Sequence, residues 1–406
     1  MTETFNTENF LIEYKPVNYK NNIILELCRQ KYYEKLKDKL NKIRIKYLTK
    51  LKKKKPDINI NDVHLYLSQE LSYDLLSILI MDMNNKKDPI FNDVSPFTKQ
   101  NLHRFFDIDK CIATININII KSILIIFPYL SNIYIRYFNK LKNKNNTKYK
   151  ITHTLNQNDV KITLDISQKT DLVIPNHIFY HLVKNYNIKK HNIYDNDKLI
   201  IDNDVITYIY ILFIRYMTLS NGNNQASILP SFKKLIKEKL NIKVELFGSP
   251  LNTSLTTFGS YFYDTDNMFG SIGNFFNMNI KKGYYEINPP FDRCIINKIF
   301  NSCLEFLLTA EKDKESLLFL FIIPYTYFKN KSSMNVSIFE DFLQFDTLLD
   351  KNKFPYIRYS RDFKKTIVKP IVSTRIFICA TSHISTYTQI NLNLFENTLK
   401  NWIKKK

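Results

Sequence analysis

A short polar motif at the end of an apolar run is the part of the sequence best suited to chemistry. Residues 284–291 read YYEINPPF. This predicts a strand that ends in a rigid loop, because neither Pro289 nor Pro290 has an N–H to continue a ladder. The side-chain carbonyl of Asn288 and the main-chain carbonyl of Pro289 could accept both hydrogens of an exocyclic adenine amine and turn its lone pair toward an incoming methyl group. Phe291 would stack on the base, a contact worth about 1–3 kcal/mol.

No strong general base is needed for this chemistry, because the nitrogen becomes acidic only as the methyl group arrives. We therefore predict a catalytic set in which a neutral asparagine serves: Asn288, Pro289, Pro290 and Phe291. An Asn-Pro-Pro sequence is also a common turn, so the motif alone leaves a purely structural role open.

Two segments upstream of the motif have a composition suited to a cofactor. Residues 244–252 form a strand pattern that ends in a turn of small residues, which permits close approach of a ligand. Residues 263–273 combine carboxylates with glycines. A carboxylate there could bond the ribose hydroxyls or the amino group of S-adenosylmethionine, or it could bond its own backbone in an Asp-rich turn.

The elements that must position these residues have the pattern of an α/β domain. After residue 203, short apolar runs alternate with helical patterns, and residues 317–323 are apolar on both faces, as in a central parallel strand covered by helices on both sides. The alternation predicts a doubly wound domain whose ligand lies at the carboxyl ends of the strands. The predicted strands are residues 244–247, 284–287, 317–323 and 375–380.

The first half of the chain has a different pattern of apolar residues, which is mainly helical. Apolar residues recur at helical spacing in three regions, a polar loop follows, and an alternating strand pattern precedes a helix that starts after Pro175. We predict helices at residues 22–55, 63–83 and 112–141, a loop at 140–150 and a strand at 160–166. His177 and His181 are four residues apart, but no third ligand accompanies them, so we expect no metal site. We predict a mainly helical domain over residues 1–200 and a second domain over 201–406.

Composition narrows the class of partner. The formal net charge of +21 in 406 residues favours a polyanion such as nucleic acid, although AT-rich coding also enriches lysine and hints at a viral or parasite source. Five dispersed cysteines suggest reduced thiols, with neither a disulfide framework nor a zinc site. The N-terminus lacks a signal-peptide pattern, and the most apolar stretch is too polar for a membrane span. We therefore expect a soluble intracellular protein, in cytoplasm or nucleus, without a membrane partner.

Several motifs taken together resemble one known family. FGSPLN at 247–252, DTD at 264–266 followed by FGS, and EINPPF at 286–291 are similar, in order and spacing, to the cap-specific adenosine N6-methyltransferases of the phosphorylated-CTD-interacting-factor group. Upstream, Arg215-Tyr216, Asn224-Gln225-Ala226 and Leu229-Pro230 extend the resemblance, and downstream FIIP at 321–324 does so. It covers residues 205–330 well and 331–406 loosely.

The resemblance implies a Rossmann-type S-adenosylmethionine-dependent methyltransferase domain preceded by the helical domain. The expected product is N6-methyladenosine beside the cap of messenger RNA, with capped or single-stranded RNA in a basic groove between the domains. Other viral or transcription proteins are further possible partners. The cofactor-binding residues it implies are Phe247, Gly248, Ser249, Pro250, Leu251, Asn252, Asp264, Asp266 and Gln225.

Two features depart from that family. Its animal members carry a WW domain that docks on the polymerase tail, whereas the only tryptophan here is Trp402, so we expect a form without that domain and without that docking. Where the family has an aromatic residue just after Ile-Pro, usually tryptophan, this chain has Tyr325 and Tyr327. Either could stack on the cap or on a base.

A stretch of basic and aromatic residues near position 360 has the composition of a single-stranded RNA contact, with charge for phosphates and rings for bases. The RNA-binding residues we predict are Arg215, Tyr325, Lys353, Arg358, Arg361, Lys364 and Lys365, the last five interleaved with Phe354, Tyr356, Tyr359 and Phe363. A twisted hairpin with a solvated basic face explains the same stretch equally well. Two other functions stay open: a DNA adenine methyltransferase and an inactive RNA-binding protein with a methyltransferase fold.

Overall fold

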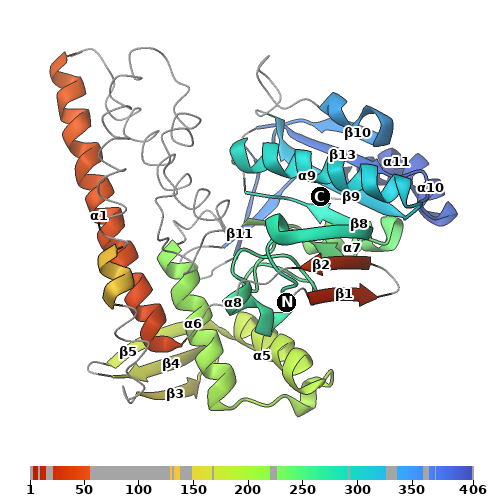
Figure 1. Ribbon diagram of the computed structural model, residues 1–406. Helices are drawn as coiled ribbons and strands as arrows, with labels where there is room; N and C mark the ends of the chain where they lie inside the picture. Colours follow the sequence, from red (N-terminus) through yellow and green to blue (C-terminus); the bar gives the residue numbers. More distant parts are fainter. Residues whose placement is uncertain are drawn as a thin grey trace.

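The computed structural model describes residues 3–7, 10–14, 22–54, 129, 132–137, 149–166, 169–219, 226–290, 293–325, 336–359, 365–370 and 372–404. Over these residues the protein is mixed α/β, with a mixed sheet on one side of the molecule and a helical part with a smaller sheet on the other (Figure 1).

The large sheet carries the second half of the chain. Its strands follow the order β1 (Glu3–Thr7), β2 (Phe10–Tyr14), β8 (Met278–Ile287), β9 (Leu317–Pro324), β13 (Thr374–Ala380) and β10 (Leu343–Leu349), and β7 (Val244–Glu245) also pairs with β8. β7, β8 and β9 are parallel, and β13 is antiparallel to both β9 and β10. Beyond β7, single parallel bridges join Glu245 to Phe258 and Phe258 to Ser271.

Helices cover both faces of this sheet. One face packs against α9 (Arg293–Lys312), and the other packs against α7 (Pro230–Leu240), α10 (Thr386–Asn393) and α11 (Phe395–Lys404). Successive residues of β9 alternate between the two cores, and its seven predicted residues are 0% exposed. The prediction of a strand buried on both faces is confirmed, although only one of its two neighbours is parallel.

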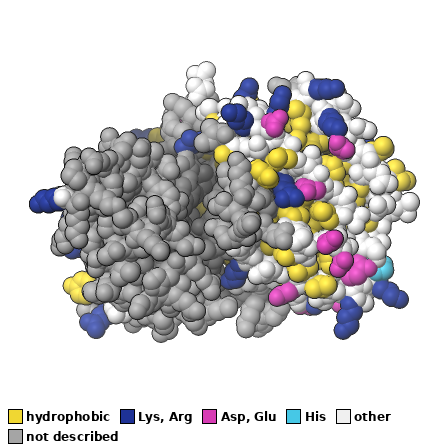
Figure 2. All heavy atoms as spheres, turned by 90° about the horizontal axis from the view of Figure 1, so that it is seen from above, with side chains coloured by type: hydrophobic (Ala, Val, Ile, Leu, Met, Phe, Trp, Pro, Cys, Tyr) yellow, Lys and Arg dark blue, Asp and Glu magenta, His cyan; other side chains and the backbone are white. Residues whose placement is uncertain are grey.

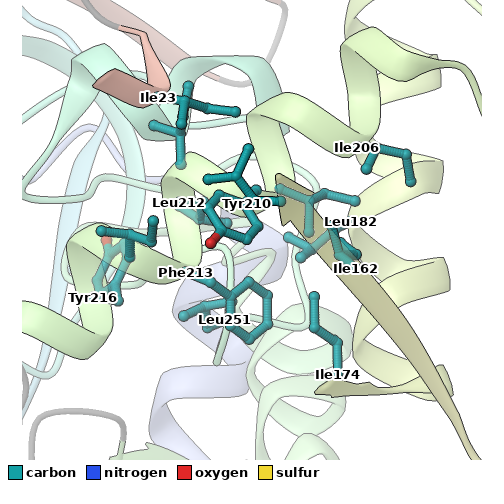
Figure 3. Close-up of a cluster of buried hydrophobic side chains, with 14 of the residues drawn as sticks. Ile23, Ile162, Ile174, Leu182, Ile206, Tyr210, Leu212, Phe213, Tyr216 and Leu251 are labelled. Atoms are coloured by element: carbon teal, nitrogen blue, oxygen red, sulfur yellow. The ribbon is translucent and has the colours of Figure 1, made fainter. Parts of the chain in front are cut away.

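The other part of the molecule has its own core. It is built from α1 (Ile23–Lys54), the antiparallel sheet of β3 (Lys150–Leu155), β4 (Asp159–Asp165) and β5 (Lys169–Pro175), α5 (Asn176–His191) and α6 (Asn203–Leu219). Figure 3 shows Ile23, Ile162, Leu182 and Phe213 from four of these elements turned toward one another. The remaining short helices are α8 (Tyr263–Asp266), η1 (Asn196–Lys198), η2 (Asn267–Phe269), η3 (Phe275–Asn277) and η5 (Val336–Phe342).

The predicted helix at 22–55, the strand at 160–166 and the helix after Pro175 are confirmed as α1, β4 and α5. Of the predicted helix at 112–141, the described residues 129 and 132–137 are helical. The predicted helix at 63–83 and most of the loop at 140–150 lie outside the described residues.

The predicted mainly helical first domain also contains strands, and two of them join the large sheet that is built mainly from the second half of the chain. β1 and β2 form a hairpin, and β2 pairs antiparallel with the amino-terminal half of β8. In the reverse direction, Leu251, Phe262 and Phe269 pack into the core of α1, α5 and α6. Elements from both sides of residue 200 therefore share one sheet and one core.

Candidate functional site

The carboxyl ends of β7 and β8 meet at the point where the strand order reverses. From β7 the chain continues to Phe258 and Ser271 on one side, and then crosses to β8 on the other side. In open α/β sheets the ligand lies outside the carboxyl ends of the strands at such a point. The two segments that leave these strand ends are 246–253 and 288–290, which contain the turn and the Asn-Pro-Pro motif singled out in the sequence.

Hydrogen bonds within the turn at 247–252 hold its shape. The Ser249 N–H donates to Asn252 Oδ1 at 2.9 Å, and Asn252 Nδ2 donates to the carbonyl of Ala226 at 3.3 Å. Asn252 thus fastens the turn to the residue that follows Gln225 in the chain. Gln225 itself lies outside the described residues, so its predicted cofactor contact stays a prediction.

Glycines let the backbone segments approach one another closely here. Gly248 N–H donates to the Gly259 carbonyl at 2.8 Å, and Gly259 N–H donates to the Glu245 carbonyl at 2.7 Å. A Cβ at Gly259 would lie 2.5 Å from the Leu246 carbonyl oxygen, and one at Gly248 would lie 3.2 Å from the Glu245 carboxylate. The turn is therefore packed directly against the strand end, and the two glycines serve close contacts within the protein.

Asn288 follows the last residue of β8 and has an acceptor to offer. Its Oδ1 is buried and has no hydrogen-bond partner among the residues that the structure describes. A buried acceptor without a partner is uncommon and calls for an explanation, one of which is a bound ligand. Pro289 is buried and Pro290 is half-buried, whereas Phe291 lies outside the described residues and its stacking role stays a prediction.

The carboxylate of Asp264 is held by a buried arginine. Arg215 Nη1 and Nη2 donate to the two oxygens of Asp264 at 3.1 and 2.7 Å, and Arg215 Nε and Nη2 donate to Glu26 at 2.7 and 2.9 Å. Arg29 donates to Glu26 as well, at 2.9 Å. Although burial by itself would raise the pKa of Glu26, the two guanidinium groups hold it below its usual value.

This network corrects the assignment of Arg215 to the RNA surface. Its side chain is 0% exposed and forms ion pairs with Glu26 and Asp264, so it offers no face to an RNA strand. α1, α6 and α8 each contribute one of these three residues. Arg215 therefore joins the helical part to the segment that precedes β8.

Asp266 is also hydrogen-bonded within the protein. Tyr216 donates its O–H to Asp266 Oδ2 at 2.6 Å, and Thr265 donates its hydroxyl to Oδ1 at 2.8 Å. Burial raises the pKa of Asp266 to about 7, against the opposing effect of these hydrogen bonds. Both aspartates of the predicted cofactor set thus bond other side chains of the protein. This favours a structural role for Asp264 and Asp266 over a contact with the ribose of a cofactor.

A buried charge cluster beneath the two strand ends was missed by the sequence analysis. Lys233 of α7, Glu245 of β7 and Glu286 of β8 have residual exposures of 4, 2 and 0%. Lys233 Nζ donates to Glu245, and Thr253 donates its hydroxyl to Glu245 Oε2 at 3.0 Å. Glutamates inside apolar strand patterns are the sequence signal that could have revealed the cluster.

The basic and aromatic stretch forms a hairpin within a three-stranded sheet. β11 (Tyr356–Tyr359) pairs antiparallel with β12 (Lys365–Val368) on one side and with β6 (Ala226–Ile228) on the other. Since Ala226 also bonds Asn252, this sheet connects directly to the turn at 247–252. Lys353, Arg358 and Lys365 are exposed, and Tyr325 is half-buried just after β9.

Two of the interleaved aromatics are unavailable to bases. Phe354 and Tyr356 are 0 and 5% exposed, and Phe354 packs against Phe232 and Trp402 in the core behind the sheet. The interpretation of alternating charges and base-stacking rings therefore fails for Phe354 and Tyr356, and a hairpin with a solvated basic face describes this part better. Arg361, Phe363 and Lys364 lie outside the described residues, as does Tyr327.

The view in Figure 2 shows one face of the described part. Lysine and arginine side chains are interspersed there with acidic ones and with a strip of apolar side chains, and they do not form one continuous basic patch. In the described ranges, no three histidine, cysteine or acidic side chains gather as a metal site would require. No helix within those ranges is both long and apolar enough to cross a membrane.

Comparison with known families gives a match that covers part of the chain. Residues 179–358 match the family model described as "Phosphorylated CTD interacting factor 1 WW domain". The match runs from α5 into β11 and includes both strand ends and their loops. Because its description names the WW domain, the expectation of a form without that domain is not borne out, even though Trp402 lies outside the matched residues. The match supports a relationship of this chain to the phosphorylated-CTD-interacting-factor family.

Proposed function

We propose that the protein is an S-adenosylmethionine-dependent methyltransferase that modifies the N6 amine of an adenosine in RNA. The observation that carries the proposal is the buried, unpartnered Oδ1 of Asn288 at the carboxyl end of β8. The family relationship supports the activity at a coarse level, and the resemblance of the motifs favours the cap-adjacent nucleotide as the acceptor.

The strand order supports a Rossmann-type domain. Numbered in chain order, β7 is the first position, the bridge residues Phe258 and Ser271 mark the second and third, and β8 and β9 are the fourth and fifth. Across the sheet these positions lie in the order third, second, first, fourth and fifth, followed by β13 and β10. The first five positions repeat the order of the dinucleotide-binding fold, and β13 is an added antiparallel strand before the sixth. In that fold the nucleotide occupies the crevice beside the first and fourth strands, here β7 and β8.

The residues at this crevice fit the cofactor. The turn at 247–252 leaves the end of β7 at this crevice, and Glu286, whose oxygens have no hydrogen-bond partner in the described part of the chain, suits a ligand that carries positive charge. When bound, S-adenosylmethionine supplies an electrophilic methyl group. The turn would hold the cofactor, and Asn288 with the Pro289 carbonyl would orient the adenine amine toward it.

The decisive experiment uses labelled S-adenosylmethionine with capped RNA, uncapped RNA and DNA oligonucleotides that begin with adenosine. Digestion to nucleosides after incubation should give labelled N6-methyladenosine from RNA, with capped RNA the better substrate. Label in DNA alone would instead identify a DNA adenine methyltransferase. Absence of label with every substrate would leave an RNA-binding protein without activity and overturn the proposal.

The exposed cations of the hairpin region should contribute to RNA affinity through phosphate contacts. Replacing Lys353, Arg358 and Lys365 together by glutamine should reduce the salt dependence of binding to a capped oligonucleotide by about two units of slope, since each phosphate contact in single strands contributes about 0.7. Fluorescence anisotropy between about 50 and 200 mM salt measures the slope.

The control removes the same charge from the opposite edge of the sheet. Lys237, Lys312 and Lys314 lie at the helix ends that precede the amino ends of β7 and β9, and all three are exposed. Their replacement by glutamine should leave the slope nearly unchanged. Equal effects of the two triple variants would show that general charge, and not the hairpin region, attracts RNA.

A further inference from the structure

Glu286, one of the three buried ionisable groups below the strand ends, bonds no group in the described part of the chain. Glu245 and Glu286 are register partners on the parallel strands β7 and β8. Their sequence neighbours Val244, Tyr285 and Ile287 belong to the core beneath α9, so both glutamates point to the opposite face, toward Lys233 of α7. Two carboxyl groups and one ammonium group therefore lie together in a buried place.

The ammonium group is bonded to only one of them. Lys233 and Thr253 both donate to Glu245, whereas neither oxygen of Glu286 has a hydrogen-bond partner in the described part of the chain. An ionised carboxylate that is buried without a partner is far too costly to persist, so the group stays neutral. Glu286 is therefore expected to carry a proton in the protein without ligand.

The groups around Glu286 agree with this state. Burial raises the pKa of Glu286 to about 8, and the carboxylate of Glu245 adds to the rise while Lys233 opposes it. From β11, Tyr356 and Tyr359 face the same cluster, and burial raises the pKa of both phenols, so they stay neutral as well. With Glu286 protonated, the pair of Lys233 and Glu245 leaves the cluster without net charge.

We propose that Glu286 loses its proton when a cationic ligand binds at the ends of β7 and β8, and that the resulting carboxylate favours a positively charged sulfonium cofactor over its neutral thioether product. Glu286 occupies the same strand as Asn288, two residues earlier, so both unpartnered acceptors serve one site. This inference rests on the proposed function, because it takes the sulfonium compound S-adenosylmethionine as the ligand.

Protons and charges balance over one turnover. In methyl transfer the carbon–sulfur bond breaks with its electron pair left on sulfur, the adenine nitrogen forms the new carbon–nitrogen bond, and that nitrogen loses one proton. One proton is therefore released per turnover with or without Glu286. Glu286 changes the step at which this proton is released to solvent. The proton of Glu286 leaves when the cofactor binds, and the Glu286 carboxylate takes up a proton again once methyl transfer has removed the positive charge from sulfur.

The number of protons released on binding tests the proposal without any measurement of activity. Calorimetric titration of S-adenosylmethionine at pH 7, in buffers that differ in ionisation enthalpy, should show release of close to one proton, whereas S-adenosylhomocysteine should release much less. The affinity for S-adenosylmethionine should rise as pH increases from 6 to 8, by up to about tenfold per unit, and then level off.

Two variants separate Glu286 from other groups. Glu286→Gln keeps the shape of the side chain but cannot ionise, so proton release should vanish and the preference for the sulfonium compound at pH 8 should fall. Glu305→Gln removes an exposed carboxylate of α9 and should behave like the wild type. The proton count of the unaltered protein is informative even if Glu286→Gln folds poorly.

The possible outcomes distinguish this inference from the proposed function. Tight binding of S-adenosylmethionine without proton release would overturn the role of Glu286 and leave the methyltransferase proposal standing. Equal proton release with the thioether would overturn the discrimination by charge. Release that persists in Glu286→Gln would assign the proton to another group, and failure of S-adenosylmethionine to bind would overturn both proposals.

Discussion

The Asn288→Ala variant is expected to lose methyl transfer by at least about 10²–10³-fold, the usual effect of deleting one oriented hydrogen-bonding group from a catalytic site. The substitution removes the only side-chain acceptor of the Asn-Pro-Pro loop and leaves the adenine amine with the Pro289 carbonyl alone. Transfer of label from S-adenosylmethionine to a capped RNA that begins with adenosine measures the loss.

The fold should survive this change. Asn288 Oδ1 bonds no described group, so its removal breaks no hydrogen bond seen in the structure. Circular dichroism and cofactor affinity should stay close to those of the wild type. Asn279→Ala is a matched control on the same strand, because Asn279 is exposed and its side-chain amide donates to Glu13, far from the Asn-Pro-Pro loop in the sequence. Near-normal activity of Asn288→Ala would refute the proposed orientation of the amine.

Among the variants proposed here, Arg215→Met should lose the most stability, about 3–5 kcal/mol in the free energy of unfolding. Methionine fills much of the same volume but leaves Glu26 and Asp264 as buried carboxylates without their main cation. Urea denaturation followed by circular dichroism measures the change. Because the pKa of Glu26 is lowered in the folded wild type, the ionic contribution is present above the ordinary glutamate pKa and is lost as pH falls.

A second arginine supplies the control. Arg375 binds both oxygens of Asp346, at 2.9 and 2.6 Å, but the two side chains are 22 and 30% exposed. Arg375→Met should therefore cost no more than about 1 kcal/mol. Adding Glu26→Gln and Asp264→Asn to Arg215→Met should recover part of the lost stability, because it removes the unpaired charges. Equal losses of unfolding free energy in Arg215→Met and Arg375→Met would contradict the expectation that burial makes the Arg215 ion pairs the more costly to break.

The spacing of apolar residues along the chain correctly predicted several helices and strands. α1, α5, β4 and β9 were predicted within a few residues, because their apolar spacing reflects the faces they bury. The site loops were also found, since prolines and small residues mark strand ends wherever the strands lie. The topological position of both loops then followed from the parallel pairing of β7 with β8.

Interactions between distant parts of the chain could not be predicted in this way. Arg215 looked like a surface cation because its partner Glu26 is 189 residues away. The alternation of basic and aromatic residues near 354–359 suggested base stacking, yet Phe354 packs on Trp402, a residue close to the end of the sequence. Glu286 was taken as part of a motif, and only the register with Glu245 revealed two carboxyl groups side by side.

The hairpin of β1 and β2 imposes an order on folding during synthesis. Glu13 of β2 bonds Asn279 of β8, 266 residues later in the chain. At about 5–20 residues per second, a ribosome needs roughly 13–50 s to make the intervening segment. Throughout that interval the inner edge of the hairpin has no partner strand, so it is exposed to wrong pairing or to chaperones. The sheet that carries Asn288 can therefore close only after most of the chain has left the ribosome.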